Sequence, residues 1–316
     1  MTNLSSYQCG IVNENDTVIL RFSDNMVPLQ VKPFHKYHSH IGMIDHTLIV
    51  GKQYGSWIEL SKDKVQILPF DSLVWLKCLS HRTQILYEAD IALIISELEM
   101  CPGQIVIESG TGSGCLSHFI IDTISPNGHL HTFDFHRIRS DLAKLEFENH
   151  RLKEFVTVQN RDVLEYGFDP VSHCADAIFI DLPEPAKVIK HCINAIKYTG
   201  ARFGSFSPCI EQIQKLIKEL NKYHATEIKV LECIKQSFDI VRVKLPDKVI
   251  NASQGRTNSI GHTGQPKDHN LYKLRISMQP RPIQPKHHKT TFGLQNYLSV
   301  TKQLKDSKTT SVLTVG

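Results

Sequence analysis

The chain has 316 residues, a formal net charge of +4, 41% hydrophobic residues and 22% charged residues, as in an ordinary globular protein of one or two domains. It contains no run of about 18 apolar residues, which argues against a transmembrane helix. Its first residues lack the basic segment and apolar core of a secretory signal. The eight cysteines include no Cys-x-x-Cys pair, so we expect reduced thiols and no metal site.

Charge is distributed unevenly along the chain. Residues 248–316 contain eleven Lys or Arg and two Asp or Glu, a balance of +9, whereas residues 1–247 balance to −5. A basic C-terminal third favours contact with a polyanion such as a nucleic acid. A solvated tail explains the same charge equally well, and it explains Arg281, Lys286 and Lys289 at least as well as phosphate contact does.

The first 80 residues predict a small all-β domain. Short apolar stretches at residues 17–22, 47–51, 57–60 and 65–68 are separated by Gly, Asn, Asp and Lys, the pattern of short strands. This spacing is typical of a small barrel or sandwich. We therefore expect an N-terminal β-barrel-like domain over residues 1–80.

From residue 81 onward the pattern changes to alternating strands and helices. Apolar residues at helical spacing predict a helix over 89–100. Strands are predicted at 104–108, 129–133, 156–159, 175–180, 200–206 and near 297–300, and helices at 115–124, 137–150, 187–197 and 208–223, the last with Pro208 in its first turn. This alternation predicts an α/β domain over 81–316, a parallel sheet with helices on both faces. Residues 248–270 are polar and contain glycine, so we expect a flexible insertion there.

A glycine-rich loop at Gly110, Gly112 and Gly114 lies between a predicted buried strand and an amphipathic helix. Glycine permits a sharp turn and close approach of a ligand, and the helix N-terminus offers free N–H groups. The spacing is G-x-G-x-G rather than the G-x-G-x-x-G of dinucleotide folds. Glu108 puts a carboxylate where a pyrophosphate would sit, but it suits the ammonium group of a methionine moiety. The loop therefore favours S-adenosylmethionine; an ordinary strand-to-helix turn is the alternative.

Two further acids follow the next predicted strands. Asp134 ends the second strand, where an acid can accept hydrogen bonds from ribose hydroxyls, and Arg139 follows one helical turn later. Asp162 follows the third strand and can accept from an adenine amino group. Each acid alone is more often a loop or cap residue. Together they mark the carboxyl ends of successive parallel strands, where such sheets bind ligands.

The fourth predicted strand leads into Asp181, which we take as the candidate catalytic residue. The run Asp181-Leu182-Pro183-Glu184-Pro185 resembles the Asp-Pro-Pro-type loop of nucleobase methyltransferases, and its prolines are expected to stiffen the loop. An Asp that caps the next helix is the alternative.

Several motifs together resemble the catalytic subunit of eukaryotic tRNA (adenine-58-N1)-methyltransferase. They are residues 82–87 (RTQILY), 108–114 (ESGTGSG), 128–132 (GHLHT), 135–136 (FH), 181–183 (DLP) and 206–211 (FSPCIE). The resemblance runs from about residue 10 to 246, and again weakly over 296–302. It implies a class I (Rossmann-like) S-adenosylmethionine-dependent methyltransferase domain preceded by a small β-barrel. It also implies nuclear tRNA maturation by a heterotetramer that includes a non-catalytic paralogous subunit.

The resemblance also implies the site residues. Asp181 is the catalytic residue, and Gly112 completes the glycine loop. The implied cofactor contacts are Leu86, Glu108, Gly110, Ser113, Gly114, Cys115, Asp134, Arg139, Asp162 and Val163. The chain departs from the family pattern in having Ala186 where an aromatic residue is expected, Glu88-Ala89 in place of a Ser/Thr helix cap, and Asp134 in place of a longer Glu.

The expected activity is methyl transfer to N1 of adenine 58 in the tRNA T-loop. Adenine N1 has a free lone pair, so the reaction needs no base, and Asp181 could accept from the exocyclic amine and stabilise the positive charge. A silent tRNA-binding paralogue and another class I methyltransferase are the alternatives. The cluster of His35, His38, His40 and His46 lacks a complete ligand set, and Cys209 lacks a histidine partner in the sequence, so neither predicts a further site.

Overall fold

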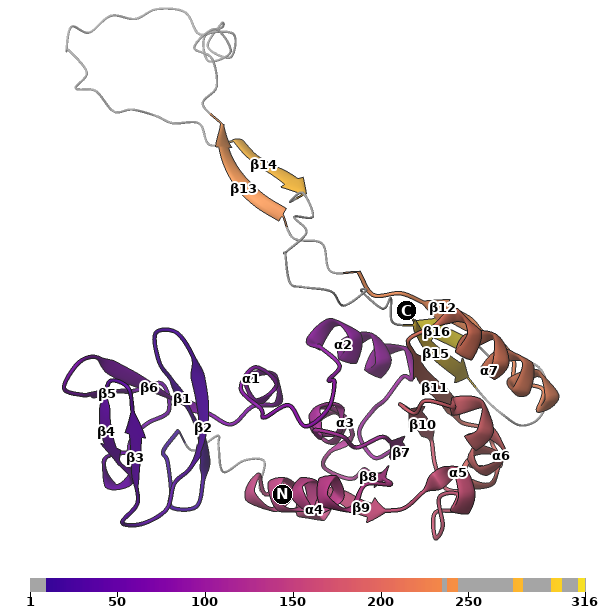
Figure 1. The fold of residues 1–316 in the computed structure, drawn as a ribbon, viewed down its shortest axis with the longest axis horizontal. Helices are drawn as coiled ribbons and strands as arrows, with labels where there is room; N and C mark the ends of the chain where they lie inside the picture. Colours follow the sequence, from indigo (N-terminus) through magenta and orange to yellow (C-terminus); the bar gives the residue numbers. More distant parts are fainter. Residues whose placement is uncertain (1–9, 235–237, 244–274, 281–296, 303–311, 316) are drawn as a thin grey trace, which may run out of the picture. The chain divides into compact units, whose positions relative to one another are not determined.

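The computed structural model describes residues 10–234, 238–243, 275–280, 297–302 and 312–315 (Figure 1). The chain forms two compact units, residues 1–233 with 293–316, and residues 234–292. In the second unit, β13 (Phe238–Val243) and β14 (Arg275–Pro280) pair antiparallel. The predicted insertion at 248–270 and the basic residues Arg281, Lys286 and Lys289 lie outside the described residues. The predicted boundary at residue 80 falls inside the first unit and stays a prediction.

The N-terminal part of the first unit consists of short antiparallel strands. They are β1 (Thr17–Arg21), β2 (Met26–Gln30), β3 (Lys36–Ser39), β4 (Gly42–Asp45), β5 (Trp57–Glu59) and β6 (Lys64–Pro69). One sheet has the order β2-β1-β6-β5, and β3 pairs with β4 separately. Their apolar side chains share one core, in which Val18, Leu20, Ile44 and Ile67 are fully buried. The strand-rich region is as expected; these pairings do not close a barrel, so the barrel stays a prediction.

The strand predicted at residues 47–51 is wrong. The chain instead forms a short 3₁₀ helix, His46–Leu48, which Asp45 caps by accepting hydrogen bonds from the Thr47 N–H at 3.0 Å and the Thr47 hydroxyl at 2.7 Å. Such a local cap competes with extended backbone.

His46 is buried, and its Nδ1 accepts from the Lys32 N–H at 2.9 Å. In the described part of the chain, no group of His, Cys, Asp or Glu side chains could hold a metal ion.

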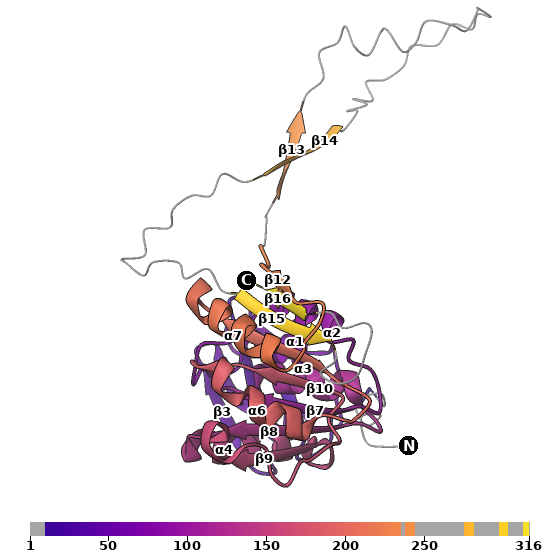
Figure 2. The same cartoon turned by 90° about the vertical axis from the view of Figure 1, so that its right-hand side faces the viewer.

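The rest of the first unit is an eight-stranded sheet with helices on both faces (Figures 1 and 2). Its strands are β7 (Ile105–Ser109), β8 (His129–Asp134), β9 (Val156–Asn160), β10 (Ala177–Ile180), β11 (Arg202–Ser207), β12 (Lys229–Leu231), β15 (Tyr297–Lys302) and β16 (Val312–Val315). The helices are α1 (Ser72–Leu76), α2 (Glu88–Glu97), α3 (Cys115–Ile124), α4 (Arg137–Asn149), α5 (Val163–Tyr166), α6 (Pro185–Ala195) and α7 (Ile210–Lys222).

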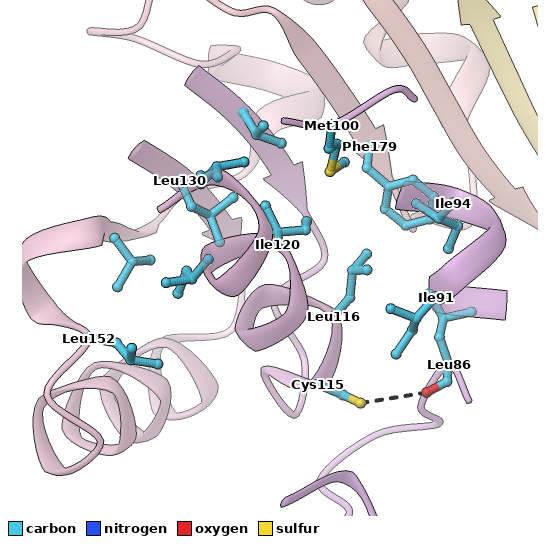
Figure 3. Packing of buried hydrophobic residues seen from close by; sticks show 14 of the residues in the cluster. Leu86, Ile91, Ile94, Met100, Cys115, Leu116, Ile120, Leu130, Leu152 and Phe179 are labelled. Atoms are coloured by element: carbon cyan, nitrogen blue, oxygen red, sulfur yellow. Dashed lines mark hydrogen bonds between the residues drawn. The ribbon is translucent and has the colours of Figure 1, made fainter. Parts of the chain in front are cut away.

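The strand order is β12-β16-β15-β11-β10-β7-β8-β9. The five adjacent strands β11, β10, β7, β8 and β9 are parallel, as predicted. Strand β15 pairs antiparallel with β11. Successive side chains of β10 point to opposite faces of the sheet and enter two cores. Phe179 packs with α2 and α3, whereas Ile178 packs with α6 and α7. Figure 3 shows the first core, with Leu116 of α3 and Ile91 of α2 near Phe179. Among the described residues, no helix combines the length and apolar character needed to cross a bilayer.

Most predicted elements have bounds within one or two residues of those observed, and α3 agrees at both ends. The helix predicted to end at residue 100 is an exception, because α2 ends at Glu97. Two helix starts differ by two residues, each at a proline. Pro208 precedes the helix: α7 begins at Ile210, with Cys209 as its N-cap. Pro185 instead begins α6, two residues before the predicted start. Proline suits a first turn because its missing N–H has no partner there. The expected stiff loop therefore ends at Glu184.

Candidate active site

A cavity of about 510 Å³ lies at the carboxyl ends of β7, β8, β9 and β10. Its wall includes Asp134, Arg139, Asp162, Val163 and Asp181. A smaller inner cavity of about 30 Å³ is lined by Leu86, Glu108, Ser113 and Cys115, among others. The two cavities share Gly110, Gly112 and Asp181 as lining residues. Parallel α/β sheets bind ligands at this edge.

Three positions in the loop between β7 and α3 favour glycine, and at two of them a side chain would clash. Gly110, Gly112 and Gly114 have φ angles of 102°, 53° and 73°, in the region that other residues rarely adopt. A Cβ on Gly110 would lie 2.4 Å from the Asp181 carbonyl oxygen, and one on Gly112 would lie 2.6 Å from Thr83 Oγ1. The glycines thus let the loop pass directly against the catalytic candidate and against residues 82–87.

Residues 82–87, which we call the strap, are fixed across the glycine loop. Ser113 Oγ accepts hydrogen bonds from the N–H groups of Arg82 at 2.9 Å and Thr83 at 3.2 Å. The Arg82 guanidinium pairs with Glu146 of α4 through two contacts, of 2.6 and 2.9 Å. The Cys115 thiol donates to the Leu86 carbonyl at 3.5 Å (Figure 3). The strap thereby places Thr83 and Gln84 in the walls of both cavities.

Glu108 is almost fully buried, at 2% exposure, and is the second-last residue of β7, the strand before the loop. Ser117 Oγ donates to its Oε2 at 2.5 Å, and Thr132 Oγ1 donates to the same oxygen at 2.7 Å. Burial, partly offset by these hydrogen bonds, raises the pKa of the Glu108 carboxyl to about 7. Because both hydroxyls meet Oε2, Oε1 is left to accept a hydrogen bond from a ligand in the inner cavity.

Asp134 is buried at the end of β8 and ties the loop to the cavity wall. Its carboxylate accepts from the Gly112 N–H at 3.0 Å and from the His136 N–H at 2.8 Å. Arg139 donates to it through Nε and through a terminal nitrogen at 2.8 Å. Asp134 and Arg139, which were expected to lie close together, form a direct ion pair. Through its bond from the Gly112 N–H, Asp134 also orients the loop, a role that the sequence did not indicate.

The other two acids occupy the remaining walls of the larger cavity. Asp162 caps α5, where its Oδ1 accepts from the Leu164 N–H at 2.9 Å. Asp181 follows β10, and its N–H donates to the Ser109 carbonyl at 2.8 Å. Burial raises the pKa of the Asp181 carboxyl to about 6, so the side chain is ionised at pH 7 but protonates in mild acid.

A protein-family model described as the tRNA methyltransferase complex GCD14 subunit matches residues 65–298. The catalytic subunit trmt61a of tRNA (adenine(58)-N(1))-methyltransferase from Dictyostelium discoideum is 39% identical over 237 residues, covering 72% of this chain and 75% of that protein. The catalytic subunit trm61 from Schizosaccharomyces pombe is 36% identical over 235 residues, covering 72% of this chain and 65% of that protein, just under two thirds of its length.

The chain belongs to this family. Two solved structures share its fold. A SAM-dependent O-methyltransferase from Thermotoga maritima has a TM-score of 0.68 at 23% identity, covering 95% of this chain and 97% of that one. The tRNA (m1A58) methyltransferase TrmI from Aquifex aeolicus has a TM-score of 0.62 at 17% identity, covering 94% and 100%. These likenesses establish the class I methyltransferase fold that the sequence predicted.

Within this family member, the structure brings the predicted site residues together. Each of them lines at least one of the two cavities except Gly114, the last glycine of the loop and the N-cap of α3. The sequence reasoning missed several wall residues, namely Thr83, Gln84, Phe135, Arg161, Leu182 and Glu184. The sequence pointed to each of them indirectly, because they lie within residues 82–87, 135–136 or 181–185, or next to Asp162. In place of the expected Ser/Thr cap, Tyr87 is the N-cap of α2 without a side-chain cap hydrogen bond, and Asp90 accepts from the Tyr87 N–H at 3.4 Å.

Gly110→Ala is expected to weaken cofactor binding strongly. The new Cβ collides with the Asp181 carbonyl, and the φ of 102° is strained for alanine, a combined cost of about 1–3 kcal/mol or more. Relief of this strain shifts the loop away from the path by which it lines both cavities, so we expect at least a roughly tenfold rise in the dissociation constant, measured by calorimetry. Gly103→Ala is the matched control, because Gly103 also has positive φ but a Cβ there meets nothing within 4 Å. Equal affinities in the two variants would contradict the close approach at Gly110.

Proposed function

We propose that the chain is the catalytic subunit of a tRNA (adenine-58-N1)-methyltransferase that uses S-adenosylmethionine. One observation carries the proposal: the glycine loop and the acids Glu108, Asp134 and Asp181 line two cavities that share wall residues at one sheet edge. Family membership supplies the substrate class, because the relatives are named as tRNA (adenine(58)-N(1))-methyltransferase catalytic subunits.

The residues present fit this cofactor. In this proposal, Glu108 in the inner cavity accepts from the ammonium group, Asp134 in the larger cavity accepts from the ribose, and Asp162 and Val163 contact the adenine. A volume of about 510 Å³ lies within the usual range of small-molecule binding sites. S-adenosylmethionine supplies an electrophilic methyl group at this site.

The remaining chemistry belongs to Asp181 and to the target base. Adenine N1 has a lone pair, so the chain needs no general base. The methylated base is cationic, and the Asp181 carboxylate accepts from its exocyclic amine and stabilises the growing positive charge. Leu182, Pro183 and Glu184 line the same end of the cavity and hold the base beside Asp181. Because adenine 58 lies within folded tRNA, the base must leave its stack to reach the cavity.

We also propose that the chain acts in the nucleus within a heterotetramer, in which a non-catalytic paralogous subunit helps to bind the tRNA. The N-terminal strands, as a barrel-like domain, and the basic C-terminal third are the candidate phosphate contacts. A silent tRNA-binding paralogue is the competing role for the chain itself. Its site would not need to keep both the close-packed glycines of the loop and a Glu108 carboxyl whose printed hydrogen bonds all go to one oxygen, so the geometry favours the enzyme.

The deciding experiment is co-expression of the chain with its candidate partner, followed by mapping of 1-methyladenosine in tRNA by reverse-transcription stops. We expect a stop at position 58 that disappears when Asp181 is replaced by alanine. Methylation elsewhere in the tRNA would contradict the position, and a chain that neither binds the cofactor nor supports methylation in any combination would favour the silent role.

A further inference from the structure

Two buried histidines lie behind the glycine loop, and the cavities do not reach them. His118 of α3 is 0% exposed, and His150, which follows α4, is 4% exposed. His118 Nδ1 lies 2.6 Å from the Gly114 carbonyl oxygen, and His118 Nε2 lies 2.9 Å from His150 Nδ1. These distances make a continuous hydrogen-bonded chain from the end of α4 to the loop.

The direction of this chain follows from the atoms in it. A carbonyl oxygen only accepts, so His118 Nδ1 carries the proton. Burial lowers the pKa of His118 to about 4 and that of His150 to about 2, so both rings are neutral at pH 7 and carry one N–H each. His118 Nε2 must therefore accept, and His150 Nδ1 donates. Both rings hold their proton on Nδ1.

The outer end of this chain is anchored on both sides. The His150 ring packs against Phe70 and Trp75, with ring centroids 4.2 and 4.6 Å away. Its neighbour Asn149 accepts from the Thr17 hydroxyl at 3.1 Å, and Arg151 pairs with Asp16 at 2.5 Å. The N-terminal strands thus hold the end of α4 in place, and with it His150.

The inner end acts on the peptide between Gly114 and Cys115. Gly114 is the left-handed N-cap of α3, and its carbonyl otherwise accepts only a long bond, 3.3 Å, from the His118 N–H. In a trans peptide the Cys115 N–H points opposite to that carbonyl. Because Cys115 lines the inner cavity, the histidine bond sets the direction of a backbone donor at the helix N-terminus beside the cavity.

We propose that His118 and His150 are positioning residues that preset the N-terminus of α3 for the carboxylate at the amino-acid end of the cofactor. This inference rests on the proposed function. Helix N-termini bind such anions through their free N–H groups, provided that the first peptide is correctly turned. His118 turns that peptide, and His150 keeps His118 in the required tautomer.

The test compares two variants of the full-length chain by calorimetry with S-adenosylhomocysteine. His118→Leu fills the space but cannot donate; His118→Asn places an amide N–H where Nδ1 was. We expect His118→Leu to raise the dissociation constant about three- to tenfold, the effect of one hydrogen bond, and His118→Asn to restore most of the affinity. Equal losses in both variants, or no loss in His118→Leu, would overturn the inference. Failure of the wild-type chain to bind would instead count against the proposed function.

A second measurement needs no ligand. ¹⁵N NMR of the histidine side chains, assigned with His118→Asn and His150→Phe, should show both rings as neutral Nδ1–H tautomers from pH 6 to 8. An Nε2–H tautomer at His118 breaks the bond to Gly114 and overturns the inference regardless of any binding result.

Discussion

Replacing Asp181 with alanine is expected to lower methyl transfer by roughly 10²–10³-fold, the usual cost of losing one preorganised electrostatic group. The carboxylate lies at the cavity wall beside Gly110, and in the proposed reaction it faces the base as positive charge develops. Because this interaction strengthens only as the reaction proceeds, the loss should appear in kcat, with cofactor affinity close to that of the wild type. Single-turnover kinetics and calorimetry separate the two quantities.

Asp181→Asn is the matched variant. Its amide oxygen still accepts from the exocyclic amine but carries no charge, so we expect activity between those of the wild type and Asp181→Ala. Activity of Asp181→Ala near the wild-type level would remove Asp181 from the mechanism, and equal activity of both variants would assign the effect to the charge alone.

The pH profile provides an independent check on the same residue. Burial raises the pKa of Asp181 to about 6, and the ionised form is the one that stabilises a cation. At saturating cofactor, the wild-type kcat should therefore fall as the pH drops through about 6, and this acid limb should be absent from Asp181→Asn. An acid limb of the same position in both enzymes would show that another group titrates.

The sequence predicted the site better than it predicted the local structure around it. Asp134, Asp162 and Asp181 were placed by one rule, that parallel strands end at the same edge of a sheet, and this rule does not depend on details of packing. The strand predicted at 47–51 was wrong because a single Asp45 cap outweighed an apolar stretch. Pro208 and Pro185 were misread because both fit a helix start, and only the packing of the helices distinguishes them.

The partners of the site residues could not be predicted. Nothing in the spacing of Arg82 and Glu146, or of His118 and His150, indicates that they meet, since each pair joins segments more than 30 residues apart. Such contacts arise from the way that α3 and α4 pack on one face of the sheet. The sequence therefore predicted residues that line the cavities and gave no sign of the contacts that hold them in place.

Glu108→Gln is expected to stabilise the ligand-free protein and to weaken cofactor binding. In the folded state, burial raises the pKa of Glu108 to about 7 from its ordinary value of 4.5. The native state then holds a proton that the unfolded state has released, so stability falls as the pH rises from about 4.5 through 7. Glutamine has no charge to bury, and its oxygen can keep the hydrogen bonds from Ser117 and Thr132. The variant should therefore melt at a higher temperature than the wild type at pH 8, with the difference shrinking toward pH 5.

The same substitution should act in the opposite direction on the ligand. The ammonium group of the cofactor would lose a charged acceptor and meet an amide N–H₂ in its place, so we expect affinity to fall roughly 10- to 150-fold, the range for a hydrogen bond to a charged group. For the wild type, the dissociation constant should rise as the pH falls below 7 and Glu108 becomes protonated; for the variant it should stay flat. Melting scans at pH 5 and 8 and calorimetry across that range measure both effects. A variant that binds as tightly as the wild type would place the ammonium group elsewhere, whereas one less stable at pH 8 would show that the buried carboxyl is ionised without cost.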